Sequence, residues 1–393
     1  MPSSFYFDEP FAKQTFSPES CVSASTEIAV FKHVPALDGL RAVAVLLVML
    51  LHVGAFFPEF AGFAKFGGMG VDIFFVLSGF LITCVLLKEH NKTGGISLKN
   101  FYVRRGLRLM PAYWFFLIVL YTSGSLLLSA ERANTTYAGG NFIYSFFYLT
   151  NWISAAAPDN VTGALTHTWS LAVEEQFYVL WSLLLFVFFR QKMTRSQLFY
   201  LTLFAVGALA FGRARRASTG GAPGSVLYFS TETRIDAMLI GCAAAMVYMW
   251  KLLPKTFYKS FCFDALALGS AGAAIFVFAG CPYSDVNYYS FALPVFTASI
   301  AVIVLWLATR ETSVFHSVLE IKAMGWTGRI SYGLYLWHSV MYEASGKFFA
   351  SSAPGVRVFI GIFLAFAAAS VSYYLVEKIF LSAKDKLTGA VVK

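Results

Sequence analysis

Charged residues are scarce in this chain. Only 13% of its 393 residues are Asp, Glu, Lys or Arg, whereas soluble domains carry about 25%. Hydrophobic residues make up 58% of the sequence. This composition excludes an ordinary soluble domain. We predict an all-α fold, namely a polytopic membrane protein with about ten transmembrane helices.

Cysteine and acidic residues are also few. The five cysteines have no close pair and no metal-ligand spacing, so we interpret them as small core residues and predict no metal site. Basic residues outnumber acidic ones by 30 to 21, a net charge of +9. They form short clusters between apolar runs and no continuous basic surface, so we predict no nucleic-acid partner.

Apolar runs near the length of a bilayer span divide most of the chain. The predicted helices are 37–57, 71–88, 109–129, 171–189, 198–212, 235–250, 263–280, 290–309, 330–346 and 355–380. Residues 1–34 contain no apolar stretch of signal length, and we interpret them as a flexible cytoplasmic tail. We therefore predict one membrane domain over residues 35–380 and a short cytoplasmic tail over 381–393.

The distribution of Lys and Arg among the short loops predicts the orientation. The loops around 88–108, 190–195, 251–259 and 310–329 are rich in both residues. The alternate loops are sparser, with an exception at 213–216. The basic set should face the cytoplasm, which places both termini inside.

Two ionisable residues on the first predicted helix share one face. Arg41 and His52 are eleven residues apart, and eleven helical steps return His52 to within about 20° of Arg41, about 16 Å along the axis. Ionisable groups are expensive in lipid, so the pair should face a protein cavity. The alternative is a flanking anchor and an interfacial histidine; Asp38, one turn before Arg41, favours a functional site.

An arginine cluster precedes the third predicted helix, which Pro111 should open. Arg104 and Arg108 are four residues apart, and Arg105 and Arg108 are three apart, so their guanidiniums can converge. Converging arginines bind phosphate through paired hydrogen bonds. Ordinary positive-inside charge is the alternative, but it does not explain why arginine replaces lysine here.

Three carboxylates lie at the predicted outer ends of helices. Asp72 follows a glycine-rich segment, where it either caps the second helix or orients an imidazole. Glu174 and Glu175 open the fourth helix, where they either complement the helix dipole or face a cavity. Adjacent residues point about 100° apart, so at most one glutamate should face the cavity. Glu174 shares its face with Tyr178.

One further ionisable residue lies deep in a predicted span. His338 falls at mid-membrane depth in the ninth helix, where a buried histidine needs a partner. It is either a substrate-binding residue or the donor of a structural hydrogen bond.

Five blocks of sequence contain these residues, in order, over about residues 35–380. They are Leu-Asp-Gly-Leu-Arg41 with ten residues to His52, Gly-Val-Asp72-Ile-Phe-Phe-Val-Leu-Ser-Gly-Phe, Arg104-Arg105-x-x-Arg108-x-x-Pro111, Thr168-Trp169-Ser170-Leu-x-x-Glu174-Glu175-x-Phe-Tyr178 and Ser331-Tyr332-x-x-Tyr335-Leu-x-His338. Together they closely resemble the acyltransferase-3 family, which comprises bacterial membrane O-acyltransferases of surface glycans and some secondary metabolites.

The resemblance implies an enzyme of the bacterial inner membrane that moves an acyl group from acyl-CoA, usually acetyl-CoA, to a sugar hydroxyl. It implies that His52 is the catalytic histidine and that Arg41 holds the donor. The other donor-binding residues that it implies are Arg104, Arg105 and Arg108. It also implies that Glu174 or Glu175 belongs to the acceptor side.

The chemistry of acyl transfer adds roles to these residues. A neutral hydroxyl is a poor nucleophile and needs a base whose pKa is near 7, which imidazole supplies. Asp72 or a glutamate would fix the tautomer of the imidazole, and Trp169 or Tyr178 would stack on a sugar. The partners implied are membrane lipid, acyl-CoA and a glycan acceptor.

Two alternatives stay open at this stage. Ten helices with buried charges would also serve a transporter of a lipid-linked glycan without chemistry. The same fold would also serve a succinyl or longer acyl donor, or a non-glycan acceptor such as a macrolide. Direct transfer and transfer through an acyl-enzyme are both compatible with the sequence.

Overall fold

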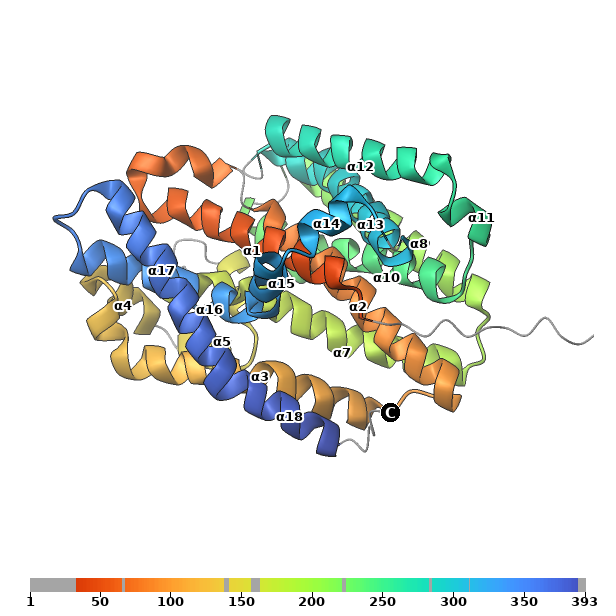
Figure 1. Cartoon of the computed structure of the whole chain (residues 1–393), viewed down its shortest axis with the longest axis horizontal. Helices are drawn as coiled ribbons and strands as arrows, with labels where there is room; N and C mark the ends of the chain where they lie inside the picture. The colour runs from red at the N-terminus through yellow and green to blue at the C-terminus, as the bar shows by residue number, and fades with distance from the viewer. Residues whose placement is uncertain are drawn as a thin grey trace, which may run out of the picture.

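The computed structural model describes residues 33–65, 68–137, 141–156, 163–220, 224–282, 285–310 and 312–387, and this part of the chain is helical with no β-strand (Figure 1). The elements in chain order are α1 (Pro35–Phe56), η1 (Pro58–Lys65), α2 (Met69–Thr93), α3 (Leu98–Leu127), α4 (Ala130–Tyr137), α5 (Asn141–Phe146), α6 (Thr150–Ala156), η4 (Gly163–Thr168), α7 (Trp169–Arg190), α8 (Arg195–Ser218), α9 (Gly224–Phe229), η5 (Thr231–Thr233), α10 (Ile235–Met249), α11 (Lys255–Tyr258), α12 (Phe261–Gly280), η6 (Tyr288–Ala292), α13 (Leu293–Thr309), α14 (Val314–Leu319), α15 (Lys322–Arg329), α16 (Ser331–Phe348), α17 (Pro354–Ser372), η7 (Tyr373–Glu377) and α18 (Lys378–Leu387).

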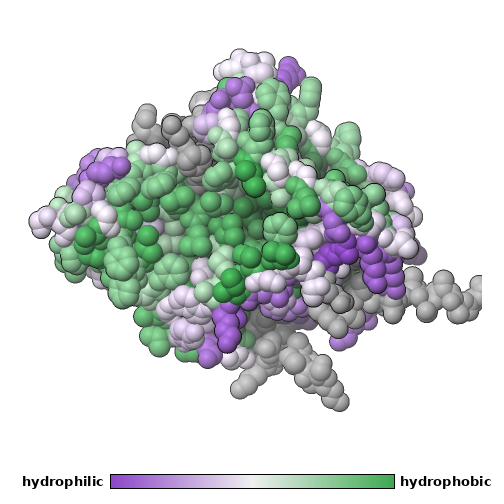
Figure 2. Space-filling model, turned by 45° about the horizontal axis from the view of Figure 1, so that its top comes forward, coloured by the Kyte–Doolittle hydropathy of each residue, from purple (hydrophilic) through white to green (hydrophobic). Residues whose placement is uncertain are grey.

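The helices confirm an all-α polytopic membrane protein. In the described residues, eight helical segments are long and apolar enough to cross a membrane: α1, α2, α3, η4–α7, α8, α12, η6–α13 and α17 with its continuation to Ser382. The other two predicted spans are also helical, as α10, which has only 15 residues, and α16, which carries many polar side chains. Figure 2 shows a largely hydrophobic face with hydrophilic patches near its margins.

A close helix crossing in the core joins α2 and α10. A Cβ atom on Gly79 would lie 1.9 Å from the carbonyl oxygen of Met238, and one on Gly241 would lie 2.1 Å from that of Val76. Each helix therefore needs a glycine where it meets the other, because no side chain fits there. This crossing fixes α2, which supplies one wall of the site described below.

Some predicted boundaries are wrong. The third helix begins at Leu98, where the Ser97 side chain caps it by accepting from the Asn100 amide, so the arginine cluster lies inside α3 and Pro111 does not open it. The last helix continues through η7 to Leu387, so the predicted tail over 381–393 is helical as far as it is described. Residues 1–32 and 388–393, which hold most of the predicted tails, lie outside the described residues.

Two buried ion pairs join α2, α8 and the start of α10. Arg234 pairs with one oxygen of Asp72, and the hydroxyl of Tyr288 donates to the other. Arg213 pairs with Asp236 at 2.6 Å. Asp72 is therefore a buried structural residue, and its prediction as a partner of His52 is wrong. Arg213 is one reason why 213–216 broke the loop-charge pattern, because its charge is neutralised inside the protein.

Candidate active site

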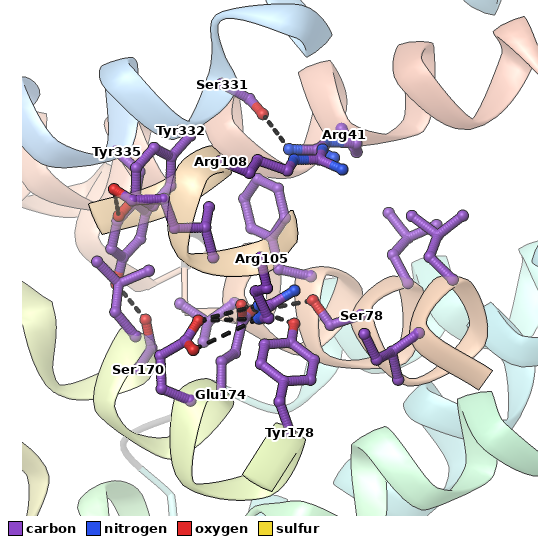
Figure 3. A pocket seen from close by; sticks show the side chains of 18 of the residues that line it. Arg41, Ser78, Arg105, Arg108, Ser170, Glu174, Tyr178, Ser331, Tyr332 and Tyr335 are labelled. Atoms are coloured by element: carbon purple, nitrogen blue, oxygen red, sulfur yellow. Dashed lines mark hydrogen bonds and ion pairs between the residues drawn. The ribbon is translucent and has the colours of Figure 1, made fainter. Parts of the chain in front are cut away.

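A pocket between α1, α2, α3, α7 and α16 gathers three arginines (Figure 3). Arg41 comes from the first two turns of α1, and Arg105 and Arg108 come from the first half of α3, so the pocket lies nearer to the starts of α1 and α3 than to their ends. We call it the basic pocket. Its polar lining comprises Arg41, Ser78, Arg105, Arg108, Tyr148, Ser170, Glu174, Glu175, Tyr178, Ser331, Tyr332 and Tyr335.

Arg41 and Arg108 lie beside each other in this pocket without a carboxylate partner. Arg41 donates to the hydroxyl of Ser331 at 3.2 Å, and its buried Nε has no partner. Arg108 lies close enough to Arg41 for their charges to repel. Asp38 and Glu377 are the nearby carboxylates, but neither forms an ion pair with these arginines in the described structure. The lining therefore carries three arginines against two glutamates, and the two arginines without an ion pair are suited to an anion.

Arg105 is held differently, by the two glutamates of α7 and a tyrosine. Its guanidinium pairs with Glu175 at 3.0 Å and lies 3.2 Å above the ring centre of Tyr178. Glu174 accepts hydrogen bonds from Tyr178 and Ser78, each at 3.1 Å. Both glutamates line the basic pocket, so the prediction that only one faces a cavity is wrong. Because Arg105 covers the ring of Tyr178, that face is closed to a sugar.

Arg104 lies outside the basic pocket. Its guanidinium pairs with Glu89 of α2 at 2.8 Å, and it is absent from the pocket lining. The predicted convergence of three arginines on α3 is therefore wrong for Arg104. One helical step of about 100° from Arg105 turns its side chain towards the end of α2 instead.

A second cavity, of about 640 Å³, contains His52. It lies where α1, α3, α4, η4 and α16 meet, near the opposite end of α3 from the basic pocket. Its lining is largely polar and comprises His52, Ala55, Phe56, Ser129, Glu131, Arg132, Thr135, Gly163, Thr166, His167, Ser339 and Glu343. Arg41 and His52 thus lie on one helix but open into different cavities.

Backbone carbonyls fix the tautomers of two adjacent histidines. Nδ1 of His52 lies 2.8 Å from the carbonyl oxygen of Val48, and Nδ1 of His338 lies 3.0 Å from that of Leu334. A carbonyl oxygen only accepts, so Nδ1 carries the proton in both rings and Nε2 of each has a free lone pair. The two ring centres are 4.5 Å apart. His338 is fully buried and lines neither cavity, and its Nδ1 donates a structural hydrogen bond to the Leu334 carbonyl.

His167 and Tyr335 complete a layer between the two cavities. The ring of His167 lies 5.3 Å from that of His338, and its Nδ1 lies 3.0 Å from the hydroxyl oxygen of Ser339. Tyr335 donates to the backbone carbonyl of His167 at 2.6 Å and lies 2.6 Å from the hydroxyl oxygen of Ser170. Ser170 and Tyr335 line the basic pocket, whereas His167 and Ser339 line the second cavity. The described residues include no cluster of His, Cys, Asp and Glu able to hold a metal ion.

Trp169 is a packing residue. Its side chain is only 3% exposed, and its ring packs against Phe75, Tyr228 and Phe229 at 4.7–6.0 Å between centres. It lines neither cavity, so the prediction that it stacks on a sugar is wrong.

Several residues of the second cavity were missed in the sequence. They are Ser129, Glu131, Arg132, Thr135, His167, Ser339 and Glu343. Two sequence signals were available: Ser339 directly follows His338, and 129–135 is a polar segment between apolar runs. Neither shows that η4, α4 and α16 meet around His52.

Residues 34–374 match the family described as an acyltransferase domain. The peptidoglycan O-acetyltransferase OatA of Listeria monocytogenes is 31% identical over 355 residues, which are 88% of this chain and 55% of that protein. The O-acetyltransferase OatA of Staphylococcus aureus strain NCTC 8325 is 29% identical over 358 residues, 88% of this chain and 57% of that protein.

The chain spans about half the length of these curated relatives. No solved structure matches it. The family match covers α1 to η7 and includes both cavities and the histidine layer. The chain therefore belongs to the acyltransferase-3 family, whose members are membrane enzymes that transfer acyl groups.

Proposed function

We propose that the protein transfers an acyl group, with acetyl as the first candidate, from acyl-CoA to a hydroxyl of a glycan. The observation that carries this proposal is the pair of arginines without an ion pair, Arg41 and Arg108, on one side of the histidine layer. His52 opens into a separate polar cavity on the other side. A donor with several phosphates suits the first site, and a hydroxyl acceptor suits the second.

The donor is proposed to bind at the basic pocket from the cytoplasm. Arg41 and Arg108 would bind phosphate oxygens, and the buried Nε of Arg41 supplies a donor that no protein group uses. The Lys- and Arg-rich loops lie at this end of the molecule, which the positive-inside rule assigns to the cytoplasm. The second cavity then faces the outside of the inner membrane.

His52 is proposed to act as the general base. Its Nδ1 proton is held by the Val48 carbonyl, so Nε2 is free to take the proton of the acceptor hydroxyl. The hydroxyl oxygen forms a bond to the thioester carbonyl carbon, and the carbon–sulfur bond breaks. The electron pair of that bond leaves with the CoA sulfur, which then takes a proton, and the product is a sugar ester. An acyl-enzyme would divide this same exchange into two steps.

Peptidoglycan is the first acceptor to test, because the Listeria monocytogenes relative is named as a peptidoglycan O-acetyltransferase. The test uses purified protein in detergent, radiolabelled acetyl-CoA and soluble peptidoglycan fragments. Label should enter the fragments with wild type and not with His52→Ala. Succinyl-CoA and longer acyl-CoAs, assayed in parallel, define the acyl group. Folded wild type that releases no CoA from any of these donors would refute the proposal.

A further inference from the structure

We propose that the second cavity is the acceptor site, where His167 binds the reacting hydroxyl beside His52. This inference rests on the proposed function, since it names the site and residues for the acceptor of that reaction. His167 and His52 both line this cavity.

The hydrogen bonds of His167 leave one ring nitrogen unused. The side chain is only 5% exposed, and Nδ1 lies 3.0 Å from the hydroxyl oxygen of Ser339. Nε2 is buried and has no partner among the described residues. An unpaired buried polar atom costs about 1–3 kcal/mol, so such an atom at a cavity needs an explanation. A bound hydroxyl supplies the missing partner.

The two histidines complement the two sides of a single hydroxyl group. His52 presents an Nε2 lone pair, because its Nδ1 proton is donated to the Val48 carbonyl, and it therefore accepts the hydroxyl proton. When Ser339 donates to Nδ1 of His167, the proton of that ring stays on Nε2, which donates to the hydroxyl oxygen. The acceptor oxygen is thus oriented by His167 while His52 removes its proton.

The rest of the cavity is suited to a carbohydrate. Arg132 pairs with Glu343 at 3.1 Å and lies 4.3 Å from the ring centre of Phe56. Glu343 also accepts from the backbone amide of Ser129 at 3.2 Å. Charged and hydroxyl groups beside one aromatic ring offer both donors and acceptors to sugar hydroxyls. The volume of about 640 Å³ is within the usual range for small-molecule sites.

The test separates acceptor binding from donor binding with three histidine variants. His167→Asn keeps an amide near the position of Nδ1 and removes the group at Nε2, whereas His167→Gln places an amide near Nε2. His316→Asn is the matched control, because His316 is also buried but both its ring nitrogens are bonded, to Ser313 and to the Leu307 carbonyl, away from both cavities.

We expect His167→Asn to raise the KM for soluble peptidoglycan fragments about tenfold or more, the loss expected for one hydrogen bond to a reacting group. The KM for acetyl-CoA should stay within about twofold, His167→Gln should recover part of the loss, and His316→Asn should behave as wild type. A folded His167→Asn variant with unchanged acceptor kinetics, or with a raised KM for acetyl-CoA alone, would overturn the inference.

A labelling experiment tests the same site without turnover. Thr135→Cys places a thiol in the cavity lining, and exposed Cys262 on α12 serves as an internal reference. Peptidoglycan fragments should slow the modification of the introduced thiol by a charged methanethiosulfonate severalfold and leave Cys262 unaffected. Equal rates with and without fragments would overturn the acceptor site. If fragments protect the thiol in a protein that never cleaves acetyl-CoA, the acceptor site is supported and the proposed reaction is refuted.

Discussion

Replacing Arg108 with Gln should weaken donor binding with little damage to the fold. Arg108 is exposed to the basic pocket and has no ion pair in the described structure, so no carboxylate loses a hydrogen-bonded partner. A hydrogen bond to a charged group contributes about 1.5–3 kcal/mol. Each 1.4 kcal/mol corresponds to about tenfold in affinity, so the KM for acetyl-CoA should rise about 10- to 100-fold. Without donor, the variant should unfold at about the same temperature, because the lost repulsion from Arg41 offsets the lost attraction to Asp38 and Glu377.

The assay is CoA release by purified protein across a range of acetyl-CoA concentrations, at low and at high KCl. Arg104→Gln is the matched control, since this neighbouring arginine pairs with Glu89 outside the pocket and such pairs contribute only about 0.2–1 kcal/mol. Arg108→Lys keeps the charge without the planar fork and should fall between wild type and Arg108→Gln. Salt should raise the KM of wild type more than that of Arg108→Gln.

A larger effect of Arg104→Gln than of Arg108→Gln on the KM for acetyl-CoA would refute this prediction. If Arg104→Gln raises the KM for acetyl-CoA more than Arg108→Gln does, the phosphates bind at the end of α2 and not in the basic pocket. If Arg108→Gln changes only the KM for the acceptor, the basic pocket binds the acceptor and not the donor.

Three further outcomes follow from the fold and the histidine layer. His52→Ala should abolish transfer while the protein stays monodisperse in detergent; measurable transfer by the folded variant would exclude His52 as the base. Arg234→Gln should destabilise the protein by about 3–5 kcal/mol, because it leaves buried Asp72 without its cation; thermal unfolding in detergent measures this, and an unchanged unfolding temperature would contradict it. Gly241→Val should lower the yield of monodisperse protein on size exclusion, because its Cβ would lie 2.1 Å from the Val76 carbonyl oxygen; wild-type yield would contradict the close helix crossing.

The helical class and the positions of most spans could be predicted because hydrophobicity along the chain reflects the membrane. Helix ends were less predictable where the helix continues past the lipid. The basic residues just before Leu109 make that segment look like a loop, yet the Ser97 cap starts α3 there. The spacing of Arg104, Arg105 and Arg108 made them look like one cluster, but Arg104 pairs with Glu89 outside the basic pocket, whereas Arg105 and Arg108 both line it.

The site was predicted in part, and its failures have a common cause. Arg41 and Arg108, which the family resemblance assigns together to the donor, lie beside each other on two helices, and His52 opens into a cavity. The contacts of the carboxylates were predicted wrongly, because the role of each carboxylate depends on which cation lies beside it in the fold. Asp72 meets Arg234 and Glu175 meets Arg105, over sequence separations of 162 and 70 residues. No local spacing encodes such pairings.

The spacing between Arg41 and His52 follows from the shape of the proposed donor. Acyl-CoA carries its phosphates at one end of a long flexible arm and its thioester at the other. An arginine that binds the phosphates must therefore lie far from the base, because the base acts on a hydroxyl that attacks the thioester at the other end. Eleven helical residues place them about 16 Å apart on the same face of α1. The layer of Tyr335, His338 and His167 closes this line between the cavities. In the proposed reaction the acyl group would pass that layer while the charged end of CoA stays in the basic pocket, and a donor on one side of the membrane would react with an acceptor on the other.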